Sequence, residues 1–204
     1  ICRWMLSQWL VITERSILIL IALGSWFWFQ PPLDQMASLS LDWVALLYIR
    51  NMVLMVFVAG CLHLFFYSLK KQGEQLRYDN RELKQLQKNF LFKNQVRDNM
   101  FWSLASGVTT WTAYEVLMFW AMANGYMPVL LWADHPVWFV VIALLTPIWI
   151  SFHFYWVHRW LHWPPLYRIA HALHHKNTNV GPWSGLSMHP VEHVIFFSSI
   201  LIHF

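Results

Sequence analysis

The sequence predicts an all-α, multi-spanning helical membrane protein with about four complete transmembrane helices, the start of a fifth, and a cytoplasmic His-rich metal region. Of its 204 residues, 58% are hydrophobic and only 12% are charged, whereas soluble domains carry about 25% charged residues. A soluble domain of this size cannot bury so much apolar surface, and a chain this apolar does not remain disordered. Only two cysteines are present, Cys2 and Cys61, and their separation excludes a disulfide scaffold.

Four long apolar segments cover roughly residues 10–30, 43–69, 100–123 and 137–157. A membrane-spanning helix needs about 20 residues, and in lipid the backbone must satisfy its own hydrogen bonds, so each segment is predicted to be a helix. A fifth segment begins after Pro190 and is still apolar at Phe204. We therefore expect the chain to be a fragment that is open at both ends.

The positive charges predict the orientation of these helices. Eight of the 14 Lys and Arg lie between Lys70 and Arg97, and the connections at 31–42 and 124–136 contain Asp but no basic residue. In a four-span arrangement, 13 of the 14 bases lie on one side, and Arg50 lies within the second span. The positive-inside rule makes that side cytoplasmic. No nucleic-acid partner is expected, because no binding motif accompanies the charge.

Two other features of the predicted helices carry expectations. In the stretch 70–100, Leu76, Leu83, Leu86, Phe90 and Leu91 recur at near-helical spacing, which predicts an amphipathic helix on the membrane surface. Arg50 and Glu115 sit inside apolar spans, where charges are costly and face the protein interior. Because their helices run in opposite directions, a structural ion pair or snorkelling is the first expectation, and a role in a substrate channel or in proton transfer is the alternative.

Three histidine motifs lie within 36 residues near the end of the sequence. They are an HxxxH, an HxxHH and a second HxxxH, formed by His158 and His162, by His171, His174 and His175, and by His189 and His193. Residues three and four apart share one face of a helix. Pro164 and Pro165 end the preceding helix near Trp163, and Pro190 fits a first helical position. The topology thus brings all three motifs to the cytoplasmic end of the bundle.

These seven imidazoles predict a metal site. Packed together without a metal they would be costly to desolvate and would lower one another's pKa values, whereas neutral imidazole binds iron, zinc and copper. A single zinc takes four ligands, so seven histidines suit two ions better. No cysteine is near enough for an iron–sulfur cluster. Among the other histidines, His63, His135 and His203 are expected to be hydrogen-bonded or interfacial. His153 lies on a different side of its helix from His158.

Residues 152–193 resemble the fatty acid hydroxylase superfamily, which includes sterol desaturases and C-4 methylsterol oxidases. The resemblance rests on the order of the three motifs, on Leu166-Tyr167-Arg168 before the second motif and on Glu192 in the third. It implies a membrane-bound non-haem di-iron oxygenase with two iron ions and O2 as co-substrate, acting on a lipid in the bilayer. The seven histidines of the motifs would hold the irons, and Glu192 would orient one imidazole.

The resemblance also implies a division of the chain and a set of partners. Residues 1–99 would form an N-terminal transmembrane hairpin with the basic connector, and 100–204 a catalytic domain lacking the family's last HxxHH. Electrons would come from a cytochrome b5-type or ferredoxin-type donor, and Trp160, Trp163 and Trp183 are candidates for the wall of a lipid tunnel. The membrane would be the endoplasmic reticulum in a eukaryote and the inner membrane in a bacterium. The alternatives are a membrane zinc hydrolase and a metal-binding or transport protein, although transport sites usually lie near the bilayer midplane.

Overall fold

The computed structural model describes residues 9–73, 79 and 81–203, and this part of the chain is helical without strands, which confirms the all-α prediction. The N-terminal half contains α2 (Trp9–Phe29), η1 (Leu33–Ala37), α3 (Leu41–His63), η2 (Leu64–Ser68), α4 (Gln95–Trp102), η3 (Ser103–Val108) and α5 (Thr109–Ala123). The rest contains α6 (Pro136–Leu161), α7 (Pro164–Leu166), η4 (Tyr167–His171), α8 (Ala172–His175), α9 (Pro190–Phe197) and η5 (Ser198–His203).

Two of the predicted spans are confirmed as helices long and apolar enough to cross a membrane. They are Leu41–Ser68, which joins α3 and η2, and Pro136–Leu161, which is α6. The first and fifth segments form shorter apolar helices over Ser16–Phe29 and Pro190–Ile202. The third segment lies in the continuous helical run of α4, η3 and α5, which is not among the candidate spans. A total of four spans therefore stays a prediction.

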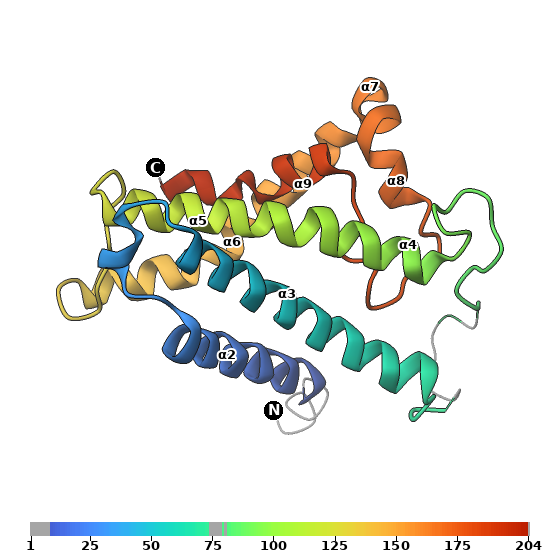
Figure 1. The fold of residues 1–204 in the computed structure, drawn as a ribbon, viewed down its shortest axis with the longest axis horizontal. Helices are drawn as coiled ribbons and strands as arrows, with labels where there is room; N and C mark the ends of the chain where they lie inside the picture. The colour runs from blue at the N-terminus through green and yellow to red at the C-terminus, as the bar shows by residue number, and fades with distance from the viewer. Residues whose placement is uncertain (1–8, 74–78, 80, 204) are drawn as a thin grey trace.

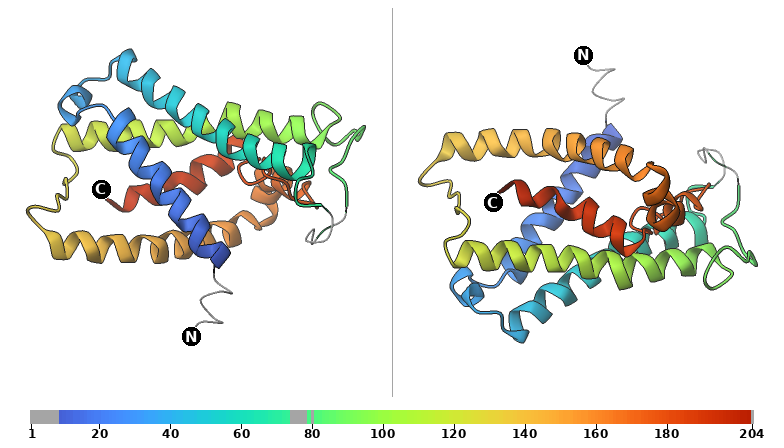
Figure 2. Two further views of the ribbon diagram at one scale, coloured as in Figure 1. Left: turned by 90° about the horizontal axis from the view of Figure 1, so that it is seen from below. Right: turned by 90° about the horizontal axis from the view of Figure 1, so that it is seen from above.

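The long helices lie side by side, and α5 is the element that joins them. It packs against α3 on one side and α9 on the other, while α2 packs on α3 and α6 packs on α9 (Figures 1 and 2). Near the α3–α5 contact, Trp43, Leu47 and Phe119 are buried with Met36 in one apolar cluster. The polar connections leave this bundle at its two ends.

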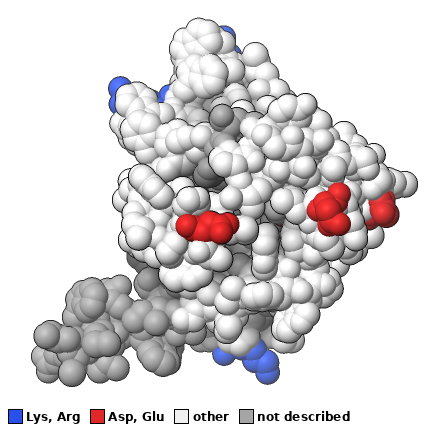
Figure 3. Space-filling model, turned by 90° about the vertical axis from the view of Figure 1, so that its left-hand side faces the viewer, with Lys and Arg blue, Asp and Glu red and all other residues white. Residues whose placement is uncertain are grey.

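The two ends of the bundle differ in charge. Residues 30–40 and 124–135 connect helices at one end, and the connector after η2 lies with α7 and α8 at the other (Figure 1). Figure 3 looks onto the first end and shows acidic side chains on its face with Lys and Arg at the margins. The side chains of Asp34 and Asp134 in these connections, and of Asp42 in the first turn of α3, are exposed. The segregation agrees with the charge pattern of the sequence, and the cytoplasmic orientation stays a prediction.

The prediction of a surface helix between residues 70 and 100 was wrong for the described part of the connector. Residues 81–94 form turns, Gln85 pairs with Asn94 in an isolated antiparallel bridge, and regular helix begins only at Gln95. Leu86 and Lys93 adopt positive φ angles of 57° and 54°, which a right-handed helix does not allow. Leu76 lies outside the described residues.

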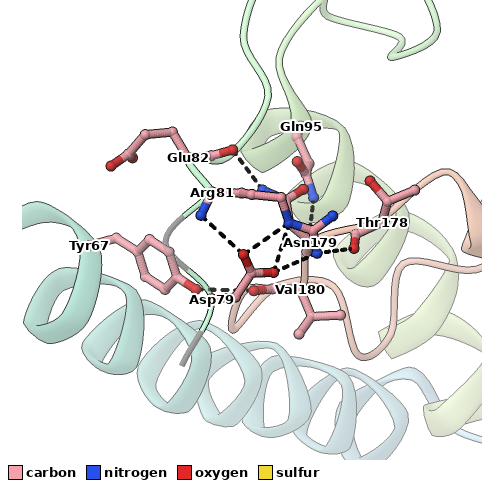
Figure 4. Close-up of polar contacts among 8 residues, drawn as sticks. All are labelled: Tyr67, Asp79, Arg81, Glu82, Gln95, Thr178, Asn179 and Val180. Atoms are coloured by element: carbon pink, nitrogen blue, oxygen red, sulfur yellow. Dashed lines mark hydrogen bonds and ion pairs between the residues drawn. The ribbon is translucent and has the colours of Figure 1, made fainter. Parts of the chain in front are cut away.

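Contacts with a distant loop explain why the connector is not a regular helix. The Arg81 guanidinium donates to the Thr178 carbonyl, and the Asn179 amide donates to the Glu82 carbonyl (Figure 4). The Gln95 amide donates to the Asn179 carbonyl at 2.7 Å. The Tyr67 hydroxyl of η2 donates to the Val180 carbonyl, one residue further along the same loop. Helical periodicity in the sequence does not reveal these tertiary contacts. They fix the connector against the segment that follows the HxxHH motif.

Candidate metal centre

The end of α6 and the turn after it bring two histidine motifs together. His158 lies in the last turn of α6, and His162 follows as its C-terminal cap, so both side chains are on one face. Trp163 is extended, with φ −61° and ψ 129°, and Pro164 then begins α7. Proline suits a first helical position because it needs no N–H partner there. The chain reverses at this point, as the sequence predicted, and η4 and α8 return along the end of α6.

The returning segment completes a cluster of four histidines, which we call the four-His cluster. Its members are His158, His162, His171 and His175, and one ligand atom from each lies within 4.8 Å of the others. The Nε2 atoms of His158 and His162 are 3.0 Å apart. Those of His171 and His175 are 2.9 Å apart. The four imidazoles therefore turn ring nitrogens toward a common centre.

The spacing of these nitrogens fits a bound metal ion. Imidazole nitrogens lie about 2.0–2.1 Å from zinc, so two nitrogens that share such an ion are at most about 4.2 Å apart. The four ligand nitrogens, which lie within 4.8 Å of one another, come within this limit if each moves by a few tenths of an ångström. No carboxylate belongs to the group within the described residues, and four neutral nitrogen donors suit iron, zinc or copper.

His171 and His175, two histidines of the cluster, have lowered pKa values. Burial lowers the pKa of His171 to about 3, and the neighbouring imidazoles, most strongly that of His175, add to this effect. Burial and His162 also lower the pKa of His175. Because protonated imidazole cannot bind a metal, these lowered pKa values leave the nitrogen lone pairs free at neutral pH.

Glu192 contacts the buried member of the cluster from the first turn of α9. Its Oε1 atom lies 2.8 Å from Nδ1 of His171, and the two side chains are 4% and 1% exposed. A hydrogen bond donated by Nδ1–H leaves Nε2 of His171 as the lone-pair atom that faces His175. This geometry agrees with the orienting role that the resemblance implies for Glu192.

The other three predicted ligands lie outside the four-His cluster. The ring of His174 is 5.7 Å from that of His171, and its Nδ1 is buried without a hydrogen-bond partner among the described residues. His189 caps α9, and its Nδ1 accepts from the backbone N–H of Val191. His193 is fully buried: Nδ1 lies 2.8 Å from Ser106 Oγ, and Nε2 lies 3.1 Å from the Leu186 carbonyl oxygen.

The remaining histidines are not members of the four-His cluster. His153 lies 3.1 Å from the Ser198 hydroxyl, away from the cluster. His63 stacks on Tyr67 with ring centroids 5.3 Å apart, and His135 precedes the first residue of α6. The side chain of His203 lies outside the described residues, as does Cys2.

Several residues around the histidines were not found by sequence reasoning. A Cβ added at Gly107 would lie 3.2 Å from Nε2 of His193, so the ring packs where only glycine leaves room. The Lys176 ammonium is 2.6 Å from the fully buried Asp98 carboxylate, which fixes the end of α8 to α4. Neither contact has a sequence signal, because the partners are 86 and 78 residues apart. In the sequence, Asp98 of α4 resembles any solvated charge.

An apolar groove of about 870 Å³ opens beside the four-His cluster. It is lined by Trp156, Val157, Arg159, Trp160, His162 and Trp163. Two of the three tryptophans predicted for a lipid tunnel are therefore here, whereas Trp183 is buried elsewhere, beside Gly60. The imidazole of His162 is therefore part of the lining of this groove.

Comparisons with known proteins point to the same segment. Residues 143–204 match the fatty acid hydroxylase family. The Delta(7)-sterol 5(6)-desaturase ERG3 of Saccharomyces cerevisiae is 47% identical over 49 residues, which cover 24% of this chain and 13% of the yeast protein. ERG3 of Candida albicans is 43% identical over 49 residues, covering 24% and 12%. The Delta(7)-sterol 5(6)-desaturase of Candida glabrata is 31% identical over 102 residues, covering 48% and 28%.

These similarities are local. The aligned segments span 12% to 28% of the length of these three relatives. No solved structure matches the chain. The match over residues 143–204 nonetheless covers all four histidines of the four-His cluster, together with Glu192 and the rest of the third motif. For the segment that they match, these comparisons support the fatty acid hydroxylase superfamily.

Proposed function

We propose that this chain forms part of a membrane-bound non-haem di-iron oxygenase that uses O2 to hydroxylate or desaturate a C–H bond of a lipid. The single observation that carries the proposal is the four-His cluster at the end of a helix of membrane-spanning length. Four imidazole donors with no carboxylate among the described ligands suit iron, zinc or copper, and the adjacent apolar groove suits an apolar substrate. The similarity to sterol desaturases makes a sterol the first substrate to test.

The protein's own residues have separate roles in this proposal. His158, His162, His171 and His175 would hold the first ion, and Glu192 would keep the His171 ring in the tautomer that offers Nε2. A bound iron pair would supply the oxidising chemistry with O2. The apolar groove would hold the lipid beside His162, with the side chains of Trp156, Trp160 and Trp163, each about half exposed, as its apolar contact surface.

The second ion would rest on histidines that lie outside the four-His cluster. His174 offers an unpartnered buried Nδ1. His189 and His193 are four residues, or about one helical turn, apart at the start of α9. For His193 to bind a metal, its ring must release either the Ser106 hydroxyl or the Leu186 carbonyl. We propose that these three histidines bind the second ion after their rings rearrange, or together with further residues of the protein.

The location and the electron donor also belong to the proposal. The end of the bundle with the basic connector faces the cytoplasm, because positive charge is retained on that side. A cytochrome b5-type or ferredoxin-type donor would approach the four-His cluster from there. The membrane is that of the endoplasmic reticulum in a eukaryote or the inner membrane in a bacterium.

The test separates this oxygenase from a zinc hydrolase and from a metal transporter. The full-length protein is purified, loaded with iron under reducing conditions and given O2, a chemical reductant and a sterol. The proposal predicts O2 consumption that depends on the sterol and an oxidised or desaturated product by mass spectrometry. Tight binding of zinc with no iron uptake would favour the hydrolase. Movement of metal into sealed vesicles would favour transport.

A further inference from the structure

A second polar site lies inside the membrane-spanning part of the bundle, away from the histidines. Arg50 of α3 forms an ion pair with Glu115 of α5, as expected from the sequence, and its side chain is only 7% exposed. Arg50 is nine residues beyond the start of the Leu41–Ser68 span, which is about 14 Å into the span. At this depth there is no water to satisfy polar groups.

The ion pair belongs to a network that joins three helices. Arg50 also donates to Asn51 Oδ1 and to Gln30 Oε1 at the end of α2. The Asn51 amide donates to Glu115 Oε2 at 2.7 Å and to the Thr112 hydroxyl at 3.1 Å. The network is thus electrically neutral as a whole.

A pocket of about 420 Å³ opens onto this network between α2, α3 and α5. Its walls are mainly apolar and include Leu18, Leu54, Trp111 and Phe119, while Gln30, Arg50 and Glu115 form its polar part. We call this space the ion-pair pocket. Chambers of this volume, with apolar walls and few polar groups, are typical of small-molecule sites.

Arg50 and Glu115, which line the pocket, retain unused hydrogen-bonding capacity among the described residues. A guanidinium has five N–H donors, and four of those of Arg50 have partners among the described residues, which leaves one N–H of Nη1. Each Glu115 oxygen accepts one bond, although a carboxylate oxygen can accept two. One free donor beside free acceptor sites matches a hydroxyl, which both accepts and donates. A charged head group would meet a like charge in Arg50 or Glu115.

The ion-pair pocket is separate from the metal centre. Glu115 faces α3, whereas the adjacent Tyr114 hydroxyl donates to the Val194 carbonyl of α9 on the other side of α5. Ser106, which contacts His193, and Glu115 are nine residues apart in one continuous helical run, about 14 Å along its axis. A ligand of this pocket therefore lies apart from the four-His cluster.

We propose that the ion-pair pocket binds a membrane lipid whose only polar group is an uncharged hydroxyl. The hydroxyl oxygen accepts from Arg50, its proton is donated to Glu115, and the apolar body lies against α2 and α3. Such a lipid joins α2 to the rest of the bundle, since α2 otherwise presents exposed apolar side chains there. The inference does not rest on the proposed oxygenase function.

Binding of radiolabelled cholesterol to the full-length protein in nanodiscs tests this site, with unlabelled cholesterol or its methyl ether as competitor. Because a hydrogen bond to a charged group contributes about 1.5–3 kcal/mol, the ether, which cannot donate, should compete at least about tenfold more weakly. In the double variant Arg50→Met/Glu115→Leu, which removes both charges together, the two competitors should become equal. Equal competition in the unaltered protein would overturn the proposal.

A matched pair of variants on α2 locates the bound lipid. Leu18 lines the pocket, whereas Leu20 does not and is 67% exposed. Leu18→Trp should abolish specific cholesterol binding, and Leu20→Trp should leave it unchanged. Unchanged binding in Leu18→Trp would overturn the proposal and indicate a site elsewhere, such as the groove beside the cluster. Metal content is measured in every variant, so that failure of this pocket is distinguished from failure of the metal centre.

Discussion

Replacing Glu192 by alanine should weaken metal binding at the four-His cluster without removing a metal ligand. The substitution leaves Nδ1–H of His171 buried with no acceptor, since the two side chains are only 4% and 1% exposed. A buried donor that loses its partner costs about 1–3 kcal/mol. Because about 1.4 kcal/mol corresponds to a factor of ten, the metal affinity should fall by about ten- to hundredfold. Losses of this size are typical when the outer hydrogen-bond partner of a ligating histidine is removed.

The assay is an anaerobic optical titration of the metal-free protein with Co(II), followed by competition with Fe(II). Glu192→Gln keeps an oxygen that accepts from Nδ1–H, and it should retain most of the affinity that Glu192→Ala loses. Asp134→Ala, at the opposite end of the bundle, is the surface control. Unchanged affinity in Glu192→Ala would refute the orienting role. A loss of equal size in Glu192→Gln would show that charge matters, rather than the position of an acceptor.

Three further outcomes follow from the structure. Gly107→Val should displace the His193 ring, because even a Cβ at this position lies 3.2 Å from Nε2, and the protein should lose roughly 1–3 kcal/mol by overpacking in a denaturation assay. Asp98→Ala leaves the Lys176 ammonium without its 2.6 Å partner and should destabilise the protein by roughly 3–5 kcal/mol, whereas Asp98→Ala/Lys176→Met should recover much of the loss. Asn51→Leu should cost about 1–3 kcal/mol, because Glu115 Oε2 loses its donor; no loss in thermal unfolding would show that the network contributes nothing to stability.

Much of the helical architecture could be predicted from the sequence, because membrane helices depend on local composition. The apolar runs located α3 and α6. Pro164 placed the end of α6 near Trp163, two residues beyond its observed end at Leu161. The pairing of Arg50 with Glu115 followed from the cost of isolated charges in lipid. These features depend on neighbouring residues or on simple solvation.

The connector and the outer contacts of the histidines depend on residues far apart in the sequence. The turns of 81–94 result from bonds such as that between Gln95 and the Asn179 carbonyl, which hydropathy cannot reveal. Helical spacing correctly indicated that His158 and His162 share a face. It did not show that His193 would bond to Ser106, or that only four of the seven motif histidines would meet. The ligand set of seven and the division at residue 99 stay predictions.

The most direct test of the account is the iron content of the full-length protein and of one cluster variant. Elemental analysis after anaerobic iron loading should give two iron ions per chain in the unaltered protein. His175→Ala should lose at least one of them, because it removes one of four nitrogens that lie within 4.8 Å of one another. His153→Ala, which removes a histidine outside the cluster, should keep both. Absence of iron from the unaltered protein, or full occupancy in His175→Ala, would contradict the account.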